Sequence, residues 1–102
     1  MVYFLTNSEG KYIKIGYTSR KNLNNRVKEL STGSSSPLYI LGYIQNGTVE
    51  LEQQLHKKYK QVNLEWFEAT LELVQYLNEN NQLDVYVDWL DGKLQVYKKM
   101  KK

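Results

Sequence analysis

Two short runs of strand-forming residues near the start of the chain constrain the fold more than any other feature. VYFLT and YIKIGYT are rich in β-branched and aromatic residues, and NSEGK between them is typical of a turn. Residues 2–17 are therefore predicted to form a β-hairpin. Because side chains alternate along a strand, the second strand has two different faces. One face carries Tyr12, Lys14 and Gly16, and the other carries Ile13, Ile15 and Tyr17.

Three later segments have the apolar spacing of a helix. Residues 21–33 form the first, and Gly33 is a suitable stop. Residues 48–60 form the second, with Thr48 as its N-cap. The third covers residues 70–81. Each segment has polar residues opposite its apolar stripe, which predicts helices that pack one side against a sheet.

The remaining patterns complete an α+β fold. Residues 37–44 predict a third strand, and residues 84–99 are two alternating runs around Asp91-Gly92, a strong signal for a hairpin. The expected architecture is a small three-stranded mixed or antiparallel sheet flanked by helices, with a C-terminal β-hairpin added.

Length and composition limit the class of protein. A chain of 102 residues has room for one modest core. It contains no cysteine, which excludes disulfides and thiolate zinc sites. No apolar run approaches the roughly 18 residues that span a bilayer, and Met1 is not followed by a charged leader and an apolar segment. We therefore expect a cytoplasmic protein without a membrane partner.

Charge is distributed unevenly along the chain. Residues 1–64 contain nine Lys or Arg and four Asp or Glu, a balance of +5, whereas residues 65–97 contain one Lys and seven acidic residues, a balance of −6. The last five residues, KKMKK, add +4. This segregation favours a polyanion that faces the first two thirds of the chain, although an unevenly charged solvated surface would look the same.

Five motifs in order resemble the GIY-YIG nuclease superfamily. They are VYF, KIG, an arginine in the following helix, ELEQQLH and EWF, and together they cover roughly residues 2–77. The pattern is most similar to the small phage and viral branch, in which KIG stands in place of YIG. Met1 occupies the first Gly position of GIY, and Lys14 occupies the Tyr position of YIG. The resemblance implies a catalytic domain over residues 1–80, with residues 81–102 forming a hairpin and basic tail that pack on the same single domain.

The resemblance also implies hydrolysis of a DNA phosphodiester assisted by one Mg²⁺ or Mn²⁺ ion on one carboxylate. Glu52 is the candidate metal ligand, and it shares a side of its helix with His56 at i and i+4. A single carboxylate suits Mg²⁺ when water and substrate oxygens complete the shell. The alternative is that Glu52 only complements the dipole at the helix start.

Arg26 and Tyr3 are candidates for contact with the reacting phosphate and water. Arg26 borders the apolar face of its helix, where a guanidinium can bind phosphate oxygens, or merely extend to solvent. Tyr3 matches the Tyr of GIY. With an ordinary pKa of about 10, it acts as a base only if a metal or cations lower that pKa; otherwise it is a core aromatic.

The remaining candidates are secondary. Lys14 could supply positive charge to Tyr3 or contact the phosphate. Tyr17 and His56 are weaker candidates, His56 as a proton shuttle or a packing residue. The identity of the general base therefore stays open. The three residues of EWF, Glu65, Trp66 and Phe67, are expected mainly in the core.

The predicted function is divalent-metal-dependent cleavage of DNA. Two alternatives remain open from sequence. One is a catalytically degenerate nucleic-acid-binding module on the same fold. The other is an interaction domain whose tyrosine-rich C-terminal hairpin pairs with another chain through an exposed edge.

Overall fold

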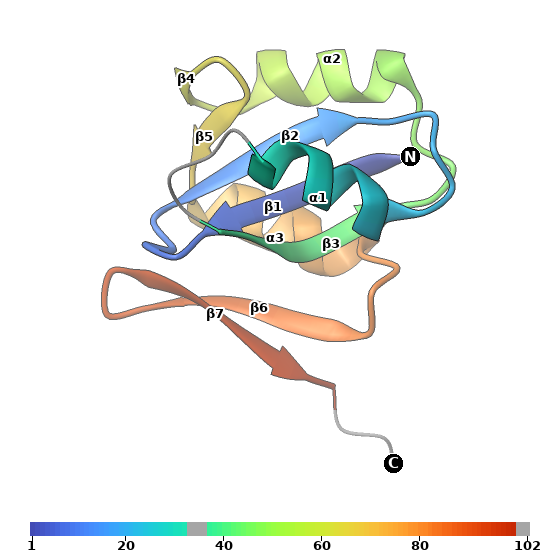
Figure 1. Cartoon of the computed structure of the whole chain (residues 1–102). Coiled ribbons are helices and arrows are strands. Elements are labelled where there is room, and N and C mark those ends of the chain that lie inside the picture. The colour runs from blue at the N-terminus through green and yellow to red at the C-terminus, as the bar shows by residue number, and fades with distance from the viewer. Residues whose placement is uncertain (33–36, 100–102) are drawn as a thin grey trace.

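The computed structural model describes residues 1–32 and 37–99, and within these ranges the fold is α+β (Figure 1). The fold class and the C-terminal hairpin are confirmed, but the main sheet is antiparallel and has five strands rather than three. The spatial order is β3-β1-β2-β5-β4. The strands are β1 (Val2–Asn7), β2 (Tyr12–Tyr17), β3 (Leu38–Ile44), β4 (Gln61–Asn63) and β5 (Trp66–Glu68), and the helices are α1 (Leu23–Thr32), α2 (Val49–Lys58) and α3 (Leu71–Asn80).

The two strands that the sequence did not predict are short. β4 and β5 have three residues each, too few for an alternating pattern to stand out. β5 pairs with β2, so that Ile13 lies opposite Phe67 and Lys14 opposite Trp66. The predicted core position of Phe67 is confirmed, because its side chain is fully buried. The predicted helix stop at Gly33 lies outside the described residues.

The helices form layers on the two faces of the sheet (Figure 1). α1 covers the face that carries Tyr3 and Leu5, which form a small buried cluster with Leu23. α3 covers the opposite face, where Leu73 and Leu77 join the larger core. α2 lies along β2 and adds Leu55, Leu51 and Tyr59 to that larger core, as the helical spacing predicted.

The starts of α2 and α3 follow directly from their sequences. The Thr48 hydroxyl accepts a hydrogen bond from the backbone N–H of Leu51 at 3.1 Å, and Thr70 accepts one from Leu73 at 3.2 Å. Each hydroxyl satisfies a donor that the first helical turn leaves unpaired. Each helix of the structure has ten residues, and within residues 1–32 and 37–99 no helix is long and apolar enough to cross a membrane.

The C-terminal hairpin consists of β6 (Val85–Leu90) and β7 (Lys93–Lys98). Asp91 and Gly92 both adopt positive φ, 55° and 75°, as a tight two-residue turn requires. Val87 is fully buried in the larger core. The Val87 N–H donates to the Asn78 side-chain oxygen at 2.8 Å, and the Asn78 side-chain nitrogen donates to the Val87 carbonyl at 2.7 Å. The Leu94 N–H of β7 also donates a hydrogen bond to the Gly10 carbonyl of the first hairpin, at 2.7 Å.

The pairing of β1 with β2 places Tyr3 directly opposite Gly16. A Cβ atom built on Gly16 would lie 2.7 Å from Cε1 of Tyr3 and nearer still to its Cζ and hydroxyl. The Tyr3 ring therefore lies across Gly16, and a side chain there would occupy the same space. The φ of Gly16 is not positive, so its backbone conformation does not require glycine. Glycine is needed there because the Tyr3 ring approaches so closely.

We predict that Gly16→Ala destabilises the fold by about 1–3 kcal/mol, the usual cost of forcing an extra group into a packed core. Urea denaturation measures the change. In a Tyr3→Ala background the ring is absent, so most of the added cost should disappear. An unchanged unfolding free energy for the single variant would contradict the close approach.

Candidate active site

Three of the predicted residues converge on the face of the sheet that α1 covers. Tyr3 on β1 and Lys14 on β2 point to this face, because Tyr3 pairs with Gly16, and Lys14, two residues from Gly16, pairs with Leu5. Arg26 extends from α1 toward Tyr3. Glu52 lies on α2 and contributes its charge to the surroundings of the Tyr3 hydroxyl. The buried phenol thus shares this face of the sheet with Lys14, and the charges of Arg26 and Glu52 act on it from two helices.

Tyr3 and Arg26 have unsatisfied polar atoms at the centre of this cluster. In the described ranges, the Tyr3 hydroxyl and Arg26 Nε are the only buried side-chain polar atoms without a hydrogen-bond partner. The Tyr3 hydroxyl and the Arg26 guanidinium are close enough for a hydrogen-bonding interaction that shifts the pKa of both groups, but the contact lacks the geometry of a full hydrogen bond. Because an unpaired buried polar atom costs stability, the pair is suited to a bound group that supplies the missing acceptor.

The pKa of Tyr3 is raised above its ordinary value. Burial is the main cause, and the Glu65 and Glu52 carboxylates add to it, while the Arg26 guanidinium opposes the rise. The Tyr3 hydroxyl in turn raises the pKa of Arg26, which therefore stays charged. Tyr3 is consequently a neutral phenol at neutral pH unless more positive charge is brought to it.

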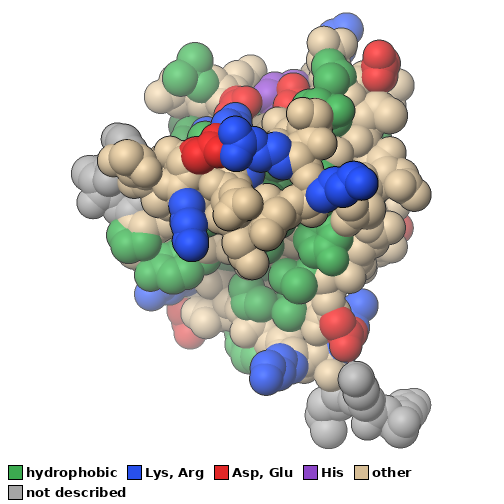
Figure 2. All heavy atoms as spheres, turned by 45° about the vertical axis from the view of Figure 1, so that its right-hand side comes forward, with side chains coloured by type: hydrophobic (Ala, Val, Ile, Leu, Met, Phe, Trp, Pro, Cys, Tyr) green, Lys and Arg blue, Asp and Glu red, His purple; other side chains and the backbone are tan. Residues whose placement is uncertain are grey.

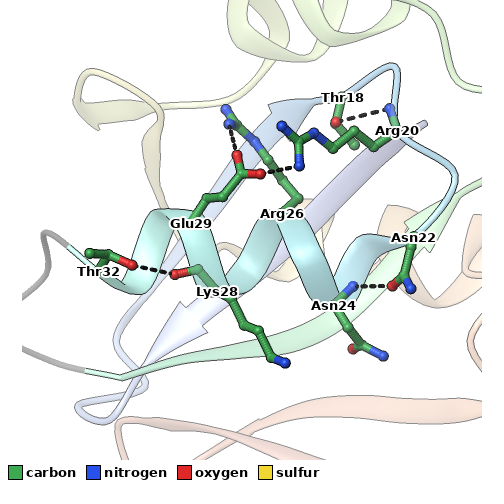
Figure 3. A network of polar contacts seen from close by, with 8 residues as sticks. All are labelled: Thr18, Arg20, Asn22, Asn24, Arg26, Lys28, Glu29 and Thr32. Atoms are coloured by element: carbon green, nitrogen blue, oxygen red, sulfur yellow. Dashed lines mark hydrogen bonds and ion pairs between the residues drawn. The ribbon is translucent and has the colours of Figure 1, made fainter.

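The Glu29 carboxylate lies between two guanidinium groups, as Figure 3 shows. It pairs with Arg20, and its other oxygen lies 3.5 Å from Nη1 of Arg26, one helical turn away. The backbone N–H of Arg20 bonds the Thr18 hydroxyl at 3.1 Å, which fixes the loop between β2 and α1. The sequence analysis did not identify Glu29, although its i,i+3 spacing from Arg26 is a detectable signal.

Lys14 is held by two residues of the EWF motif. Its Nζ lies 3.0 Å from Oε2 of Glu65 and 5.5 Å from the centroid of the Trp66 ring. The expectation of a core position was wrong for Glu65, whose side chain is 40% exposed and belongs to this cluster. On the face shown in Figure 2, basic and acidic side chains and the histidine gather in one region.

Two further candidates lie away from the Tyr3 hydroxyl. Tyr17 points to the opposite face of the sheet and packs against the larger core. His56 shares the predicted side of α2 with Glu52, but its Nε2 lies 3.0 Å from the carbonyl oxygen of Ile15. A carbonyl only accepts, so Nε2 carries the proton and donates. The imidazole also packs edge-on against Phe67, with 4.8 Å between ring centroids.

His56 therefore has a structural task. The Ile15 N–H bonds the Glu65 carbonyl, where β5 begins, and the Ile15 carbonyl points to the same edge beyond β5. No residue of β5 pairs with Ile15, so His56 supplies the hydrogen-bond donor that a neighbouring strand would otherwise supply.

The donor set around Glu52 is compatible with a weakly held Mg²⁺ or Mn²⁺. In the described part of the chain, no group of three or more His, Cys, Asp or Glu residues could form a protein-only metal site. Mg²⁺ commonly binds one or two carboxylates and takes its other ligands from water and phosphate. Glu52 is half-buried and its charge acts on the Tyr3 hydroxyl, so it fits such a site.

One protein-family model covers most of the chain. The sequence model of the T5orf172 domain matches residues 1–90. The chain belongs to the T5orf172 family. This is a phage-associated domain of the GIY-YIG-like nuclease fold family. No curated protein and no solved structure matches the chain significantly. The T5orf172 match includes β6 of the C-terminal hairpin as well as the three-helix part.

We predict that His56→Phe lowers the unfolding free energy by about 1–3 kcal/mol, because it retains an aromatic ring beside Phe67 but leaves the Ile15 carbonyl unpaired. Thermal and urea denaturation check this. His56→Gln offers an amide donor and should recover part of the loss. A His56→Phe protein that melts like wild type would argue against the capping role and return the proton-shuttle role to this residue.

We also predict that Tyr3 makes the protein sensitive to alkali. Its raised folded-state pKa stabilises the fold below the unfolded pKa of about 10, and this contribution is lost as pH rises through the folded pKa. Between about pH 9 and 11, Tyr3→Phe should therefore lose less stability than wild type. Urea denaturation across this range measures the slope, with Tyr39→Phe as the control at an exposed position. Parallel curves for wild type and Tyr3→Phe would refute the effect.

Proposed function

We propose that this protein is a DNA endonuclease that cleaves phosphodiesters with Mg²⁺ or Mn²⁺. The observation that carries the proposal is the pair of buried, unpartnered atoms, Tyr3 hydroxyl and Arg26 Nε, on the sheet face that also carries Lys14 and within the influence of the Glu52 charge. Under this proposal a phosphate would supply acceptor oxygens for the guanidinium, and the attacking water would lie next to the phenol. Membership of a family with a GIY-YIG-like nuclease fold supports this chemistry.

Arg26 would bind the non-bridging oxygens of the scissile phosphate. Glu29 pairs with its guanidinium at Nη1, and its buried Nε has no hydrogen-bond partner. Donors fixed before the reaction stabilise developing negative charge without further reorganisation. Lys14, on the same face, would add a second positive charge near the same phosphate.

Tyr3 would orient the attacking water and accept its proton. Burial opposes this role because it keeps the phenol neutral. The Arg26 guanidinium favours the phenolate, and binding of substrate would exclude water and strengthen this effect. The requirement for added positive charge is therefore part of the proposed mechanism.

Glu52 would hold the divalent ion, with water and phosphate oxygens completing its shell. When bound, the ion would supply Lewis-acid stabilisation of charge on the phosphate. The side chain comes from the first turn of α2, so Thr48, which caps that turn, fixes its position.

The charge distribution supports DNA as the substrate. Arg20, Arg26 and Lys14 lie around α1 and β2, whereas β6 of the C-terminal hairpin, which carries Asp88, packs against α3 and β3. A phosphate backbone that binds the first region would keep the hairpin carboxylates on another side. The same hairpin exposes Tyr86 and Tyr97 as a cross-strand pair, which is the feature that favours the alternative role as an interaction module.

We predict that Glu52→Gln abolishes cleavage but retains DNA binding. The amide is a poor ligand for a hard cation, so cleavage of supercoiled or branched DNA should fall by at least about 100-fold. The unfolding free energy should change by less than about 1 kcal/mol. Cleavage assays with Mg²⁺, Mn²⁺ or EDTA, together with a salt-dependent binding assay, measure both effects.

Glu50→Gln is the matched control, because Glu50 is also in the first turn of α2 but is exposed. It should cut like wild type. Full metal-dependent cleavage by Glu52→Gln would refute the proposed ligand. Salt-sensitive binding without cleavage by the wild-type protein would instead support the nucleic-acid-binding module.

A further inference from the structure

Glu65 is attached to β2 through both its backbone and its side chain. Its carbonyl oxygen accepts a hydrogen bond from the Ile15 N–H at 3.0 Å, and its carboxylate lies 3.0 Å from Nζ of Lys14. The next residue, Trp66, places its ring 5.5 Å from the same Nζ. Two consecutive residues thus hold the Lys14 ammonium, which is the part of the side chain that would act on a phosphate.

Stability alone does not account for this ion pair. The Glu65 side chain is 40% exposed, and pairs at such exposure contribute little to folding because solvent screens them. The Lys14 side chain is only 15% exposed, and a lysine has a flexible stem that does not fix its own charge. The contact therefore has its main effect on where the ammonium lies.

We propose that Glu65 is a positioning residue that holds the Lys14 ammonium on the sheet face of the Tyr3–Arg26 pair, where it would meet the scissile phosphate. This inference rests on the proposed nuclease function for its catalytic consequence. Its structural consequence, an ordered Lys14, does not depend on cleavage. Fixing a charge before the substrate arrives avoids reorganisation during the reaction.

Glu68, three residues after Glu65 and at the end of β5, offers a matched comparison. Glu68 is 42% exposed and pairs with Lys60 at 3.4 Å, so it resembles Glu65 in exposure and in having a lysine partner. The Lys60 side chain is 72% exposed and lies outside the cluster. Glu68→Gln therefore removes an equivalent surface ion pair without affecting the proposed site.

The first test measures the order of Lys14 by NMR on the full chain without DNA. The Lys14 side-chain signals, identified by their loss in Lys14→Arg, should show the ring-current shift of a group held over Trp66. In Glu65→Gln they should move toward the values of an exposed lysine, and in Glu68→Gln they should stay. Unchanged Lys14 signals in Glu65→Gln would overturn the positioning role.

The second test measures cleavage kinetics. Glu65→Gln should lower kcat by about 10-fold to 100-fold, the range typical of groups that orient a functional residue. KM and the melting temperature should change little. Glu65→Asp, which keeps the charge, should recover part of kcat. In a Lys14→Met background, Glu65→Gln should have no further effect, because the residue acts through Lys14.

The outcomes separate the inference from the proposed function. If the wild-type protein binds DNA but does not cut it, the nuclease proposal fails, while the NMR comparison still decides whether Glu65 orders Lys14. Faster cleavage or tighter DNA binding by Glu65→Gln would mean that Glu65 competes with phosphate for Lys14, and would overturn the inference. Equal losses in Glu65→Gln and Glu68→Gln would do the same.

Discussion

The pairing of β1 with β2 is the constraint on which the rest of the structure depends. It sets Tyr3 opposite Gly16, so the ring can lie across a position without a side chain. A shift of one residue in this pairing would put Tyr3 and Lys14 on opposite faces of the sheet. The same pairing creates two different sheet faces for the helices to cover. Tyr3 and Leu5 lie on the face under α1, and Phe4 lies on the face under α3.

Ion pairs organise the charged groups around the buried phenol. Arg26 is bound to Glu29, and Lys14 is bound to Glu65, so each cation has a carboxylate that limits its movement. The carboxylates leave the Tyr3 hydroxyl and Arg26 Nε unpaired. A fold that keeps two such atoms buried loses some stability, which is the usual relation between a preorganised site and the chain that carries it.

The edge of the sheet joins this cluster to α2. β5 covers only part of β2, and beyond it the Ile15 carbonyl is bonded by His56. Because Glu52 lies one turn earlier on the same side of α2, the contact that satisfies the sheet edge also fixes the orientation of the candidate metal ligand. A packing role for the histidine and a chemical role for the glutamate are thus compatible on one helix.

Local sequence determined much of this protein, and tertiary structure decided the composition of the site. Turn residues around Asp91-Gly92, the caps Thr48 and Thr70, and the alternation in β2 act over a few residues, so the sequence predicted the hairpins, helices and faces. The contact between His56 and Ile15 joins residues 41 apart, and the Glu65 contact to Lys14 depends on a strand of three residues. Neither has a local periodicity. Such partners are chosen by which elements pack together and by which unpaired groups must be satisfied, and that is a property of the whole fold.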